Sequence, residues 1–425
     1  MLDIKLFREN PDIVRNDLKK RKYADKLKLV DEIINMDNEW KKILSQVEEL
    51  KAKRNKVSKE ISLIKEAKLK AAKISEMQEN NKKIESMEKA CTEKETVLNM
   101  MLSQVPNIMD ASVPIGKDDS ENVEAKQWGK KPNFDFKILA HQELCEKNDW
   151  YDVLRGTKVA GARSYFLKGS LARLNMALIS YAQDFIMKKG FTLMTPPYMN
   201  YDKCFFGTGF LPAGKDDLYE IKGEGMSLIG TSEVPITSYH MDETLIESDL
   251  PKKYCGYSAC FRTEAGSHGK DEKGIFRVHQ FEKVEMVILC KPEESPKMHE
   301  FLLKNAEEFW QSLGIHYRVV NICTGDLGVV ASKKYDIEAW FPGQDRYREI
   351  VSCSNCKDYQ SRRLNIKYRE KEGMSPKGLV HTLNSTLFAN TRCLIAIIEN
   401  FQTKDGKVRI PKVLQPYFGG KEFLE

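Results

Sequence analysis

Proline and glycine are missing from most of the first quarter of this chain. No proline lies between Asp12 and Pro106, and no glycine precedes Gly116, although the 425 residues include 15 prolines and 25 glycines. These residues interrupt helices and build tight turns. Their absence argues against a turn-rich β domain here and permits long unbroken helices.

Long apolar runs and targeting signals are also absent. No stretch of about 18 apolar residues occurs, which excludes an obvious transmembrane helix. The N-terminal segment has no apolar core of a signal peptide, and its acidic residues (Asp3, Glu9, Asp12 and Asp17) argue against a mitochondrial transit sequence. We therefore expect a cytoplasmic protein with no membrane partner.

Repeated metal-ligand and nucleotide-loop motifs are absent too. One CxxC pair, Cys353 and Cys356, stands among ten scattered cysteines, and no second pair completes a four-ligand zinc site. We interpret the cysteines as reduced thiols, with a redox pair as the alternative. Neither GxGxxG after a strand nor GxxxxGK[ST] is present, so the two common nucleotide-binding loops are excluded.

What the N-terminal region does contain is a heptad pattern. Apolar residues alternate at spacings of three and four over residues 33–64, which is the signature of a coiled-coil seam. The seam positions are Ile33, Met36, Trp40, Ile43, Val47, Leu50, Arg54, Val57, Ile61 and Ile64. A weaker register runs from Ile74 to Val105. The simplest structure for both is an antiparallel helical hairpin that turns near residues 65–73.

Basic residues concentrate around that turn. Between Lys51 and Lys73 there are nine basic residues and two acidic ones. A solvated helix face is one interpretation. The other is a basic tip that grips a phosphate backbone and gains affinity through counterion release.

The chain changes character after Pro106. Residues 110–134 resemble a linker, and helix and strand patterns then intermix over residues 135–425. The predicted helices span 138–148, 170–189, 232–243, 295–313 and 386–400. The predicted strands span 164–168, 191–195, 257–263, 275–289, 316–322 and 336–341. Neighbouring strands that form hairpins favour an α+β fold, an antiparallel sheet flanked by helices, with residues 1–109 as a separate coiled-coil domain.

Charged residues gather in the predicted hairpin of residues 257–287. Arg262 and Glu264 share one side of a strand, and Arg277, Phe281 and Glu285 share one side of its partner. A cross-strand salt-bridge ladder is one interpretation. The other is a site in which arginine binds phosphate or carboxylate while Phe281 stacks on a base.

These residues resemble the second signature motif of class II aminoacyl-tRNA synthetases. Residues 190–200 (GFTLMTPPYMN) resemble the first motif, and residues 383–400 resemble the third, with Arg392 as its arginine. Residues 230–233 and 349–356 are similar to segments of seryl-tRNA synthetases, as is the long N-terminal hairpin. The resemblance spans the whole chain and implies the class II catalytic fold, with a tRNA-binding arm.

The resemblance implies a role for each matching residue. Arg262, Glu264 and Arg392 are implied as catalytic residues that contact the α-phosphate, the adenine side and the γ-phosphate of ATP. The implied ATP-binding set is Arg262, Thr263, Glu264, Val278, His279, Gln280, Phe281, Glu349, Ile350, Val351, Ser352 and Arg392. Within that set, Phe281 is implied to stack on adenine, and Glu349 and Ser352 are implied to hold Mg²⁺.

The same resemblance implies a serine site and its partners. The serine-binding set is Thr231, Ser232, Glu233, Arg262, Glu285, Asn384 and Thr386. Thr231 and Glu233 are implied to bind the α-amino group, and Glu285 the hydroxyl. The implied tRNA-binding set is Lys51, Lys53, Arg54, Lys56 and Lys59. The implied partners are ATP, L-serine, tRNA(Ser) and a second copy of the chain, with tRNA(Sec) as a further candidate acceptor.

Three features leave alternatives open. The third motif lacks the glycines usual before its arginine, so any of residues 384–386 is a candidate for the serine contact. The loop of residues 265–274 is expected to reach toward ATP and the tRNA end, and the alternative for His268, Lys270 and Lys273 is that they are simply solvated. The alternative function is a synthetase-like paralogue that charges no tRNA.

Overall fold

The computed structural model describes residues 1–265 and 273–425, which form two compact units. One unit is Leu2–Pro106, and the other is Asn107–Glu425 together with Met1. His268 and Lys270 of the predicted contact loop lie outside the described residues. No helix among those described is both long and apolar enough to cross a bilayer.

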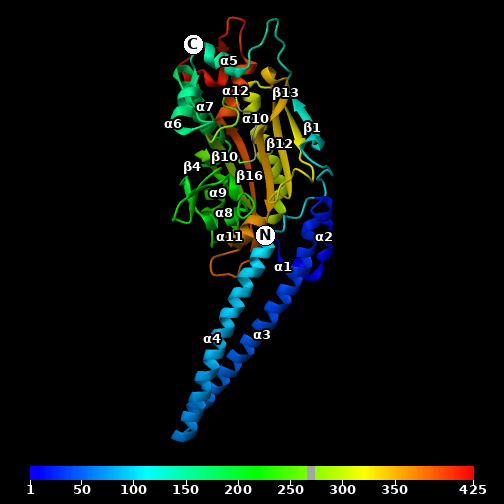
Figure 1. Ribbon diagram of the computed structural model, residues 1–425, viewed down its shortest axis with the longest axis vertical. Helices are drawn as coiled ribbons and strands as arrows, with labels where there is room; N and C mark the ends of the chain where they lie inside the picture. Colours follow the sequence, from blue (N-terminus) through cyan, green and yellow to red (C-terminus); the bar gives the residue numbers. More distant parts are fainter. Residues whose placement is uncertain (266–272) are drawn as a thin grey trace. The chain divides into compact units, whose positions relative to one another are not determined.

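The first unit is a long antiparallel helical hairpin preceded by two short helices. Helices α1 (Ile4–Glu9) and α2 (Pro11–Lys20) lead into α3 (Leu27–Leu63), and α4 (Ala67–Ser103) returns beside α3 (Figure 1). The predicted seam is confirmed, because every predicted position of α3 is buried or half-buried while the residues between them are largely exposed. The turn is shorter and earlier than predicted, at residues 64–66. Ile74 is exposed, because few side chains surround the seam so close to the turn.

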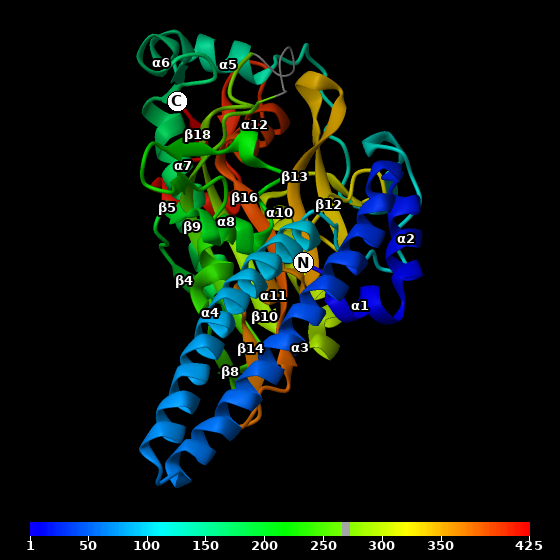
Figure 2. The same cartoon turned by 60° about the horizontal axis from the view of Figure 1, so that its bottom comes forward.

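The second unit is organised around a mostly antiparallel sheet. The order of its eight described strands is β1 (Val123–Trp128), β11 (Tyr317–Asn321), β12 (Lys333–Phe341), β13 (Arg346–Lys357), β16 (His381–Ala389), β10 (Gln280–Cys290), β9 (Lys252–Phe261) and β4 (Thr192–Met194). Only the β4–β9 pair among them is parallel. Strands β10, β16, β13 and β12 can be followed side by side in Figure 2. The predicted α+β class is confirmed.

Three helices supply the core against this sheet. These are α7 (Gly169–Met187), α10 (Ser295–Leu313) and α12 (Asn390–Asn400). The first two match their predicted ranges closely. The prediction of one helix over 386–400 is wrong at its start, since residues 386–389 end strand β16. A short apolar run does not distinguish a buried strand from a buried helix.

Smaller elements complete the unit. The remaining helices are α5 (His141–Lys147), α6 (Val153–Ala160), α8 (Asp202–Thr208), α9 (Glu233–Thr237) and α11 (Tyr359–Leu364). The short strands are β2 (Tyr151–Asp152), β3 (Phe166–Leu167), β5 (Met199–Tyr201), β6 (Tyr219–Ile221), β7 (Met226–Leu228), β8 (Thr244–Ile246), β14 (Lys367–Arg369), β15 (Gly378–Leu379), β17 (Val408–Arg409) and β18 (Phe423–Leu424). The predicted helix 232–243 is shorter, because a 3₁₀ turn follows α9 at Ser238–His240.

Candidate active site

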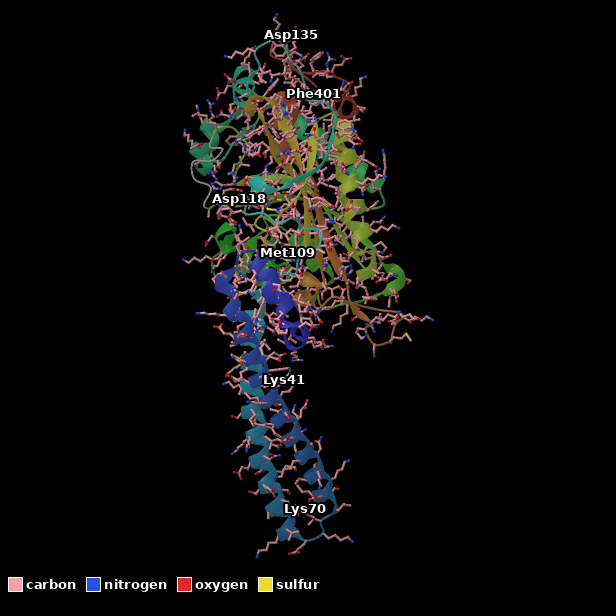
Figure 3. All side chains as sticks on the ribbon, turned by 90° about the vertical axis from the view of Figure 1, so that its right-hand side faces the viewer. Lys41, Lys70, Met109, Asp118, Asp135 and Phe401 are labelled. Carbon is pink, nitrogen blue, oxygen red and sulfur yellow. The ribbon has the colours of Figure 1, made fainter. Side chains whose placement is uncertain are left out.

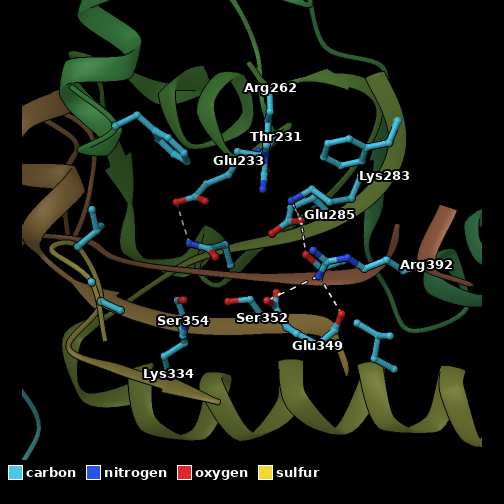
Figure 4. Close-up of a pocket in the computed structure, with 18 of the residues that line it drawn as sticks. Thr231, Glu233, Arg262, Lys283, Glu285, Lys334, Glu349, Ser352, Ser354 and Arg392 are labelled. Carbon is cyan, nitrogen blue, oxygen red and sulfur yellow. Dashed lines mark hydrogen bonds and ion pairs between the residues drawn. The ribbon is translucent and has the colours of Figure 1, made fainter. Parts of the chain in front are cut away.

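A cavity of about 450 Å³ opens on the sheet face opposite the main core. Successive side chains of strand β10 point to opposite faces of the sheet, so one set packs in the core and the other lines the cavity. Val284, Met286 and Ile288 point into the core, whereas Phe281, Lys283 and Glu285 line the cavity. Figure 4 shows the charged side chains of several strands converging there.

A β-bulge in strand β13 brings Glu349 and Ser352 to the same cavity. In a regular strand, residues three apart face opposite sides. The β12–β13 register shifts between Ile337 and Glu338, so one extra residue is accommodated, and both side chains line the cavity. A second bulge, in the β10–β16 pairing, places Thr386 directly opposite Glu285.

Glu233, at the start of α9, forms one carboxylate of the cavity. Its Oε1 atom accepts hydrogen bonds from Asn384 Nδ2 at 2.9 Å and from Gln360 Nε2 at 2.8 Å. Burial, followed by the negative charge of Glu285, raises the pKa of Glu233 to about 7. Thr231 also lines the cavity, and its Oγ1 accepts a hydrogen bond from the Glu233 backbone N–H at 3.1 Å.

Glu285 forms the second carboxylate and is almost fully buried, at 2% exposure. It pairs with Lys283 and accepts a hydrogen bond from Thr386 Oγ1 at 3.0 Å. Lys283 was missing from the predicted site. Its spacing of two residues from Glu285 on a strand was the available signal, because such residues share a face.

Arg262 contributes a positive charge to the cavity and lies against the ring of Phe281. The Arg262 guanidinium carbon lies 5.3 Å from the Phe281 ring centroid, and Nε donates to Gly230 O at 3.2 Å. Glu264 is held by Arg277 at 2.6 Å. The prediction that Arg262, Glu264 and Arg277 lie on paired strands is wrong, because β9 ends at Phe261 and β10 begins at Gln280. Phe281 and Glu285 lie on β10, paired with β9, as predicted. The side chains of Arg262, Glu264 and Arg277 nevertheless meet Phe281 and Glu285 in one cavity, reaching it from the strand ends.

Arg392, from α12, contributes another positive charge to the cavity. It donates to the Glu349 backbone O at 2.8 Å, and its guanidinium lies 3.6 Å from the Glu349 carboxylate. Enclosure by the cavity raises the pKa of Glu349, but Arg392 and then Lys334 outweigh this and hold that pKa below its usual value. Lys334 lines the cavity and was also missed by sequence reasoning.

Several predicted residues do not line the cavity. Ser232 Oγ donates to Gly256 O at 3.3 Å, and a His279 ring nitrogen lies 3.0 Å from Arg262 O. Thr263 Oγ1 donates to Asp216 O at 2.5 Å. Gln280 is exposed, and Val351 packs into the core. The residues of the predicted set that do line the cavity are Thr231, Glu233, Arg262, Glu264, Val278, Phe281, Glu285, Glu349, Ile350, Ser352, Asn384, Thr386 and Arg392.

The CxxC cysteines point in different directions. Cys353 belongs to the main core, whereas Cys356 lines the cavity beside Asn384. Burial raises the pKa of both thiols, which favours the neutral form. Among the residues that the structure describes, no group of three or more His, Cys, Asp or Glu could hold a metal ion.

The predicted tRNA-binding residues lie along α3, and some are already paired. Lys51 contacts Glu88 at 2.6 Å and Lys53 contacts Glu76 at 3.7 Å, both across the hairpin. Lys56 and Lys59 are exposed, and Arg54 is half-buried. Counting charge along the sequence therefore overstated the basic character of this region, because α4 returns acidic residues to it. Figure 3 places Lys70 at the tip of the hairpin.

Comparisons with known proteins find matches over the whole chain. The family model for the seryl-tRNA synthetase N-terminal domain matches residues 1–109, and the model for the class II tRNA synthetase core domain (G, H, P, S and T) matches residues 219–401. The serine–tRNA ligase of Methanocella arvoryzae is 48% identical over 425 residues, which is 100% of both chains. That of Thermococcus onnurineus is 46% identical over 100% of this chain and 97% of its own.

Two solved structures are similar at full length. The crystal structure of seryl-tRNA synthetase from Pyrococcus horikoshii complexed with ATP has a TM-score of 0.91 and 44% identity, covering 100% of this chain and 99% of the other. The cytoplasmic serine–tRNA ligase of Naegleria fowleri in complex with AMP has a TM-score of 0.87 and 41% identity, again covering 100% and 99%. The chain therefore belongs to the seryl-tRNA synthetases, class II ligases that use ATP to join serine to tRNA.

Proposed function

We propose how the residues of this cavity divide the work of a serine–tRNA ligase. One observation supports the proposal: the carboxylates of Glu233 and Glu285 share a single cavity with the guanidinium groups of Arg262 and Arg392. The carboxylates suit the ammonium and hydroxyl groups of serine. The arginines suit phosphate oxygens.

Serine binds at the carboxylates in this proposal. Glu233 and Thr231 receive the α-ammonium group, and Glu285 accepts the side-chain hydroxyl. Asn384 and Thr386 orient these two carboxylates, since each donates a hydrogen bond to one of them. The Ser232 hydroxyl supports the site from behind through its bond to Gly256.

ATP binds in the part of the cavity formed by Arg262 and Arg392. Arg262 contacts the α-phosphate, Arg392 the γ-phosphate, and Phe281 the face of adenine, with Glu264 at the adenine side. The floor beneath the nucleotide comes from Ile350 of β13 and from Val278, just before β10, because both line the cavity. His279, Gln280 and Val351 follow these two residues along the chain, and Thr263 lies between Arg262 and Glu264, but none of these four lines the cavity. The relatives solved with ATP and with AMP support an adenine-nucleotide site in this chain.

Glu349 and Ser352 fit a magnesium ion. Both place oxygen atoms at the cavity, and about half of the Glu349 side chain (48%) is accessible to a ligand. Magnesium is commonly held by one or two protein groups plus substrate phosphates and water. When bound, it would neutralise phosphate charge.

The chemistry then needs position and charge, and no protein nucleophile. A serine carboxylate oxygen forms a bond to the α-phosphorus of ATP, and the bond to the pyrophosphate leaving group breaks. Arg262 and Arg392 offset the negative charge that this approach brings together. In the second step the 3′-terminal ribose hydroxyl of tRNA(Ser) attacks the seryl carbonyl, and AMP leaves.

We assign tRNA binding to the hairpin of α3 and α4. Exposed Lys56 and Lys59, with Lys51, Lys53 and Arg54, line its basic stretch. Deleting residues 33–103 should abolish charging of tRNA(Ser) and leave serine-dependent ATP–pyrophosphate exchange intact. Normal charging by the deletion variant would overturn this assignment, and charging of tRNA(Sec) is measured in the same assay.

We also propose a cytoplasmic homodimer. Strand β4 lies at an edge of the sheet and contacts α7, which carries the exposed apolar side chains of Met176 and Met187. The Naegleria relative is described as cytoplasmic. Analytical ultracentrifugation of the wild type and of Met176→Lys tests the dimer, which the variant should weaken.

The decisive test of the site is ATP–pyrophosphate exchange measured with each of the twenty amino acids. Serine alone should support rapid exchange, and Arg262→Ala should abolish it. Arg155→Ala, which removes an exposed arginine paired with Asp152, is the matched control and should behave as wild type. Undiminished exchange in Arg262→Ala would refute the site assignment.

A further inference from the structure

Gln360 stands directly behind the serine site without lining it. It belongs to α11, and its side chain is fully buried. The cavity wall in front of it is Glu233, whose carboxylate Gln360 contacts. A buried amide needs partners for its polar atoms, and those partners show what it does.

Every hydrogen-bonding group of this amide has a partner. Its Nε2 donates to Glu233 Oε1 at 2.8 Å and to Thr208 O at 3.0 Å. Its Oε1 accepts from Thr382 Oγ1 at 2.6 Å. Because Nε2 faces two acceptors and Oε1 faces a hydroxyl, only one orientation of the amide satisfies all three contacts. Thr382 is itself fully buried.

The two amide donors of Glu233 act on the same oxygen. Asn384 Nδ2, like Gln360 Nε2, donates to Oε1. Within residues 1–265 and 273–425, Oε2 of Glu233 makes no hydrogen bond or ion pair, since both amide donors bind Oε1. The protein thus saturates one oxygen and leaves the other for the cavity.

We propose that Gln360, locked by Thr382, is a positioning residue that reserves Oε2 of Glu233 for the α-ammonium group of serine. The inference rests on the proposed role of Glu233 and extends it to two residues that touch no substrate. Donation to a carboxylate also favours its ionised form, which is the form that binds an ammonium group.

The charged surroundings of Glu233 give the proposal a pH signature. Glu285 faces it from β10 and raises its pKa, while Gln360, Lys283 and Arg262 lower it; the neutral Cys356 thiol lies nearby on β13. Removing the Gln360 donor should raise the Glu233 pKa further. The acid limb of kcat/KM for serine should then move to higher pH.

The experiment compares Gln360→Met and Thr382→Val with wild type in serine-dependent ATP–pyrophosphate exchange. Gln360→Met should raise the KM for serine about tenfold or more, the effect of one charge-assisted hydrogen bond, with little change in the KM for ATP. Thr382→Val keeps the amide but frees it to rotate, so a smaller shift in the same direction is expected. Thr382→Ser, which retains the hydroxyl, should restore wild-type values.

Thr237→Val is the matched control for a buried threonine. Thr237 ends the same helix as Glu233, is fully buried, and has a hydroxyl without a partner among the described residues. This variant should leave serine KM and the pH profile unchanged. Thermal melting of all variants distinguishes loss of folding from loss of positioning. If Gln360→Met does not fold, the proposal is tested by Thr382→Val.

The outcomes separate two failures. If Glu233→Gln raises serine KM but Gln360→Met and Thr382→Val leave KM and the acid limb unchanged, the positioning role is refuted and the serine site stands. If Glu233→Gln itself has no effect, the proposed function of Glu233 fails. An equal loss for serine and ATP in Thr382→Val would indicate general structural damage and also refute the inference.

Discussion

Replacing Glu285 with glutamine tests how this site selects serine over alanine. The substitution keeps the shape of the side chain and removes its charge. In the structure, Glu285 already has two partners, Lys283 and Thr386 Oγ1. A carboxylate offers about four acceptor positions, so a serine hydroxyl would be a third partner and not the first.

This arrangement sets the expected magnitude. If Glu285 lacked partners, alanine would leave a buried charge unpaired, and discrimination of about 10⁴ or more would follow. With Lys283 and Thr386 in place, alanine forfeits only one charge-assisted hydrogen bond, about 1.5–3 kcal/mol. That energy corresponds to roughly 10- to 150-fold discrimination, at about 1.4 kcal/mol per factor of ten.

The assay is ATP–pyrophosphate exchange with serine and with alanine. In Glu285→Gln, the serine-to-alanine ratio of kcat/KM should fall by up to about 10- to 150-fold, because the uncharged amide binds the serine hydroxyl more weakly. Loss of the negative charge beside Lys283 affects the two amino acids alike and cancels in this ratio. Glu282→Gln is the matched control, because Glu282 lies on the same strand but contacts Asn175 and Tyr257 outside the cavity. A retained serine-to-alanine ratio in Glu285→Gln, with a normal melting temperature, would refute the reasoning.

Three further predictions concern the arm, the pH profile and the core. Changing Lys56 and Lys59 to glutamine should raise the KM for tRNA and reduce the salt dependence of charging, with unchanged ATP–pyrophosphate exchange; an unaltered salt slope would contradict a phosphate contact. Because the pKa of Glu233 is raised to about 7 and its ionised form binds ammonium, kcat/KM for serine should fall as pH drops below about 7, and Glu233→Gln should lose that limb. Trp310→Phe removes a buried hydrogen bond to Leu387 O. The free energy of unfolding, measured by urea denaturation, should fall by about 1–2 kcal/mol, and the KM for serine should stay normal. A rise in that KM would contradict the prediction and show that the core and the site are coupled through the sheet.

Local patterns in the sequence predicted the parts of this protein whose structure depends on near neighbours. The seam of α3 follows from apolar spacing, because a helix repeats its faces every few residues whatever lies elsewhere. The side of β10 that carries Phe281 and Glu285 follows from strand alternation for the same reason. The signature motifs added the family, and with it the set of residues that meet in the cavity.

Such local patterns did not predict contacts between segments that are far apart in the sequence. Lys334 and Gln360 reach the site only because the sheet and α11 bring residues far apart in sequence together, and acidic residues of α4 neutralise lysines of α3 only once the hairpin has folded. The bulge in β13 is the clearest case: alternation alone would place Glu349 and Ser352 on opposite faces, and pairing with β12 decides that they share one. The sequence by itself determined the helical arm and the chemistry present in the site. The tertiary structure decided which partners each charged group has, because those partners come from other strands and helices.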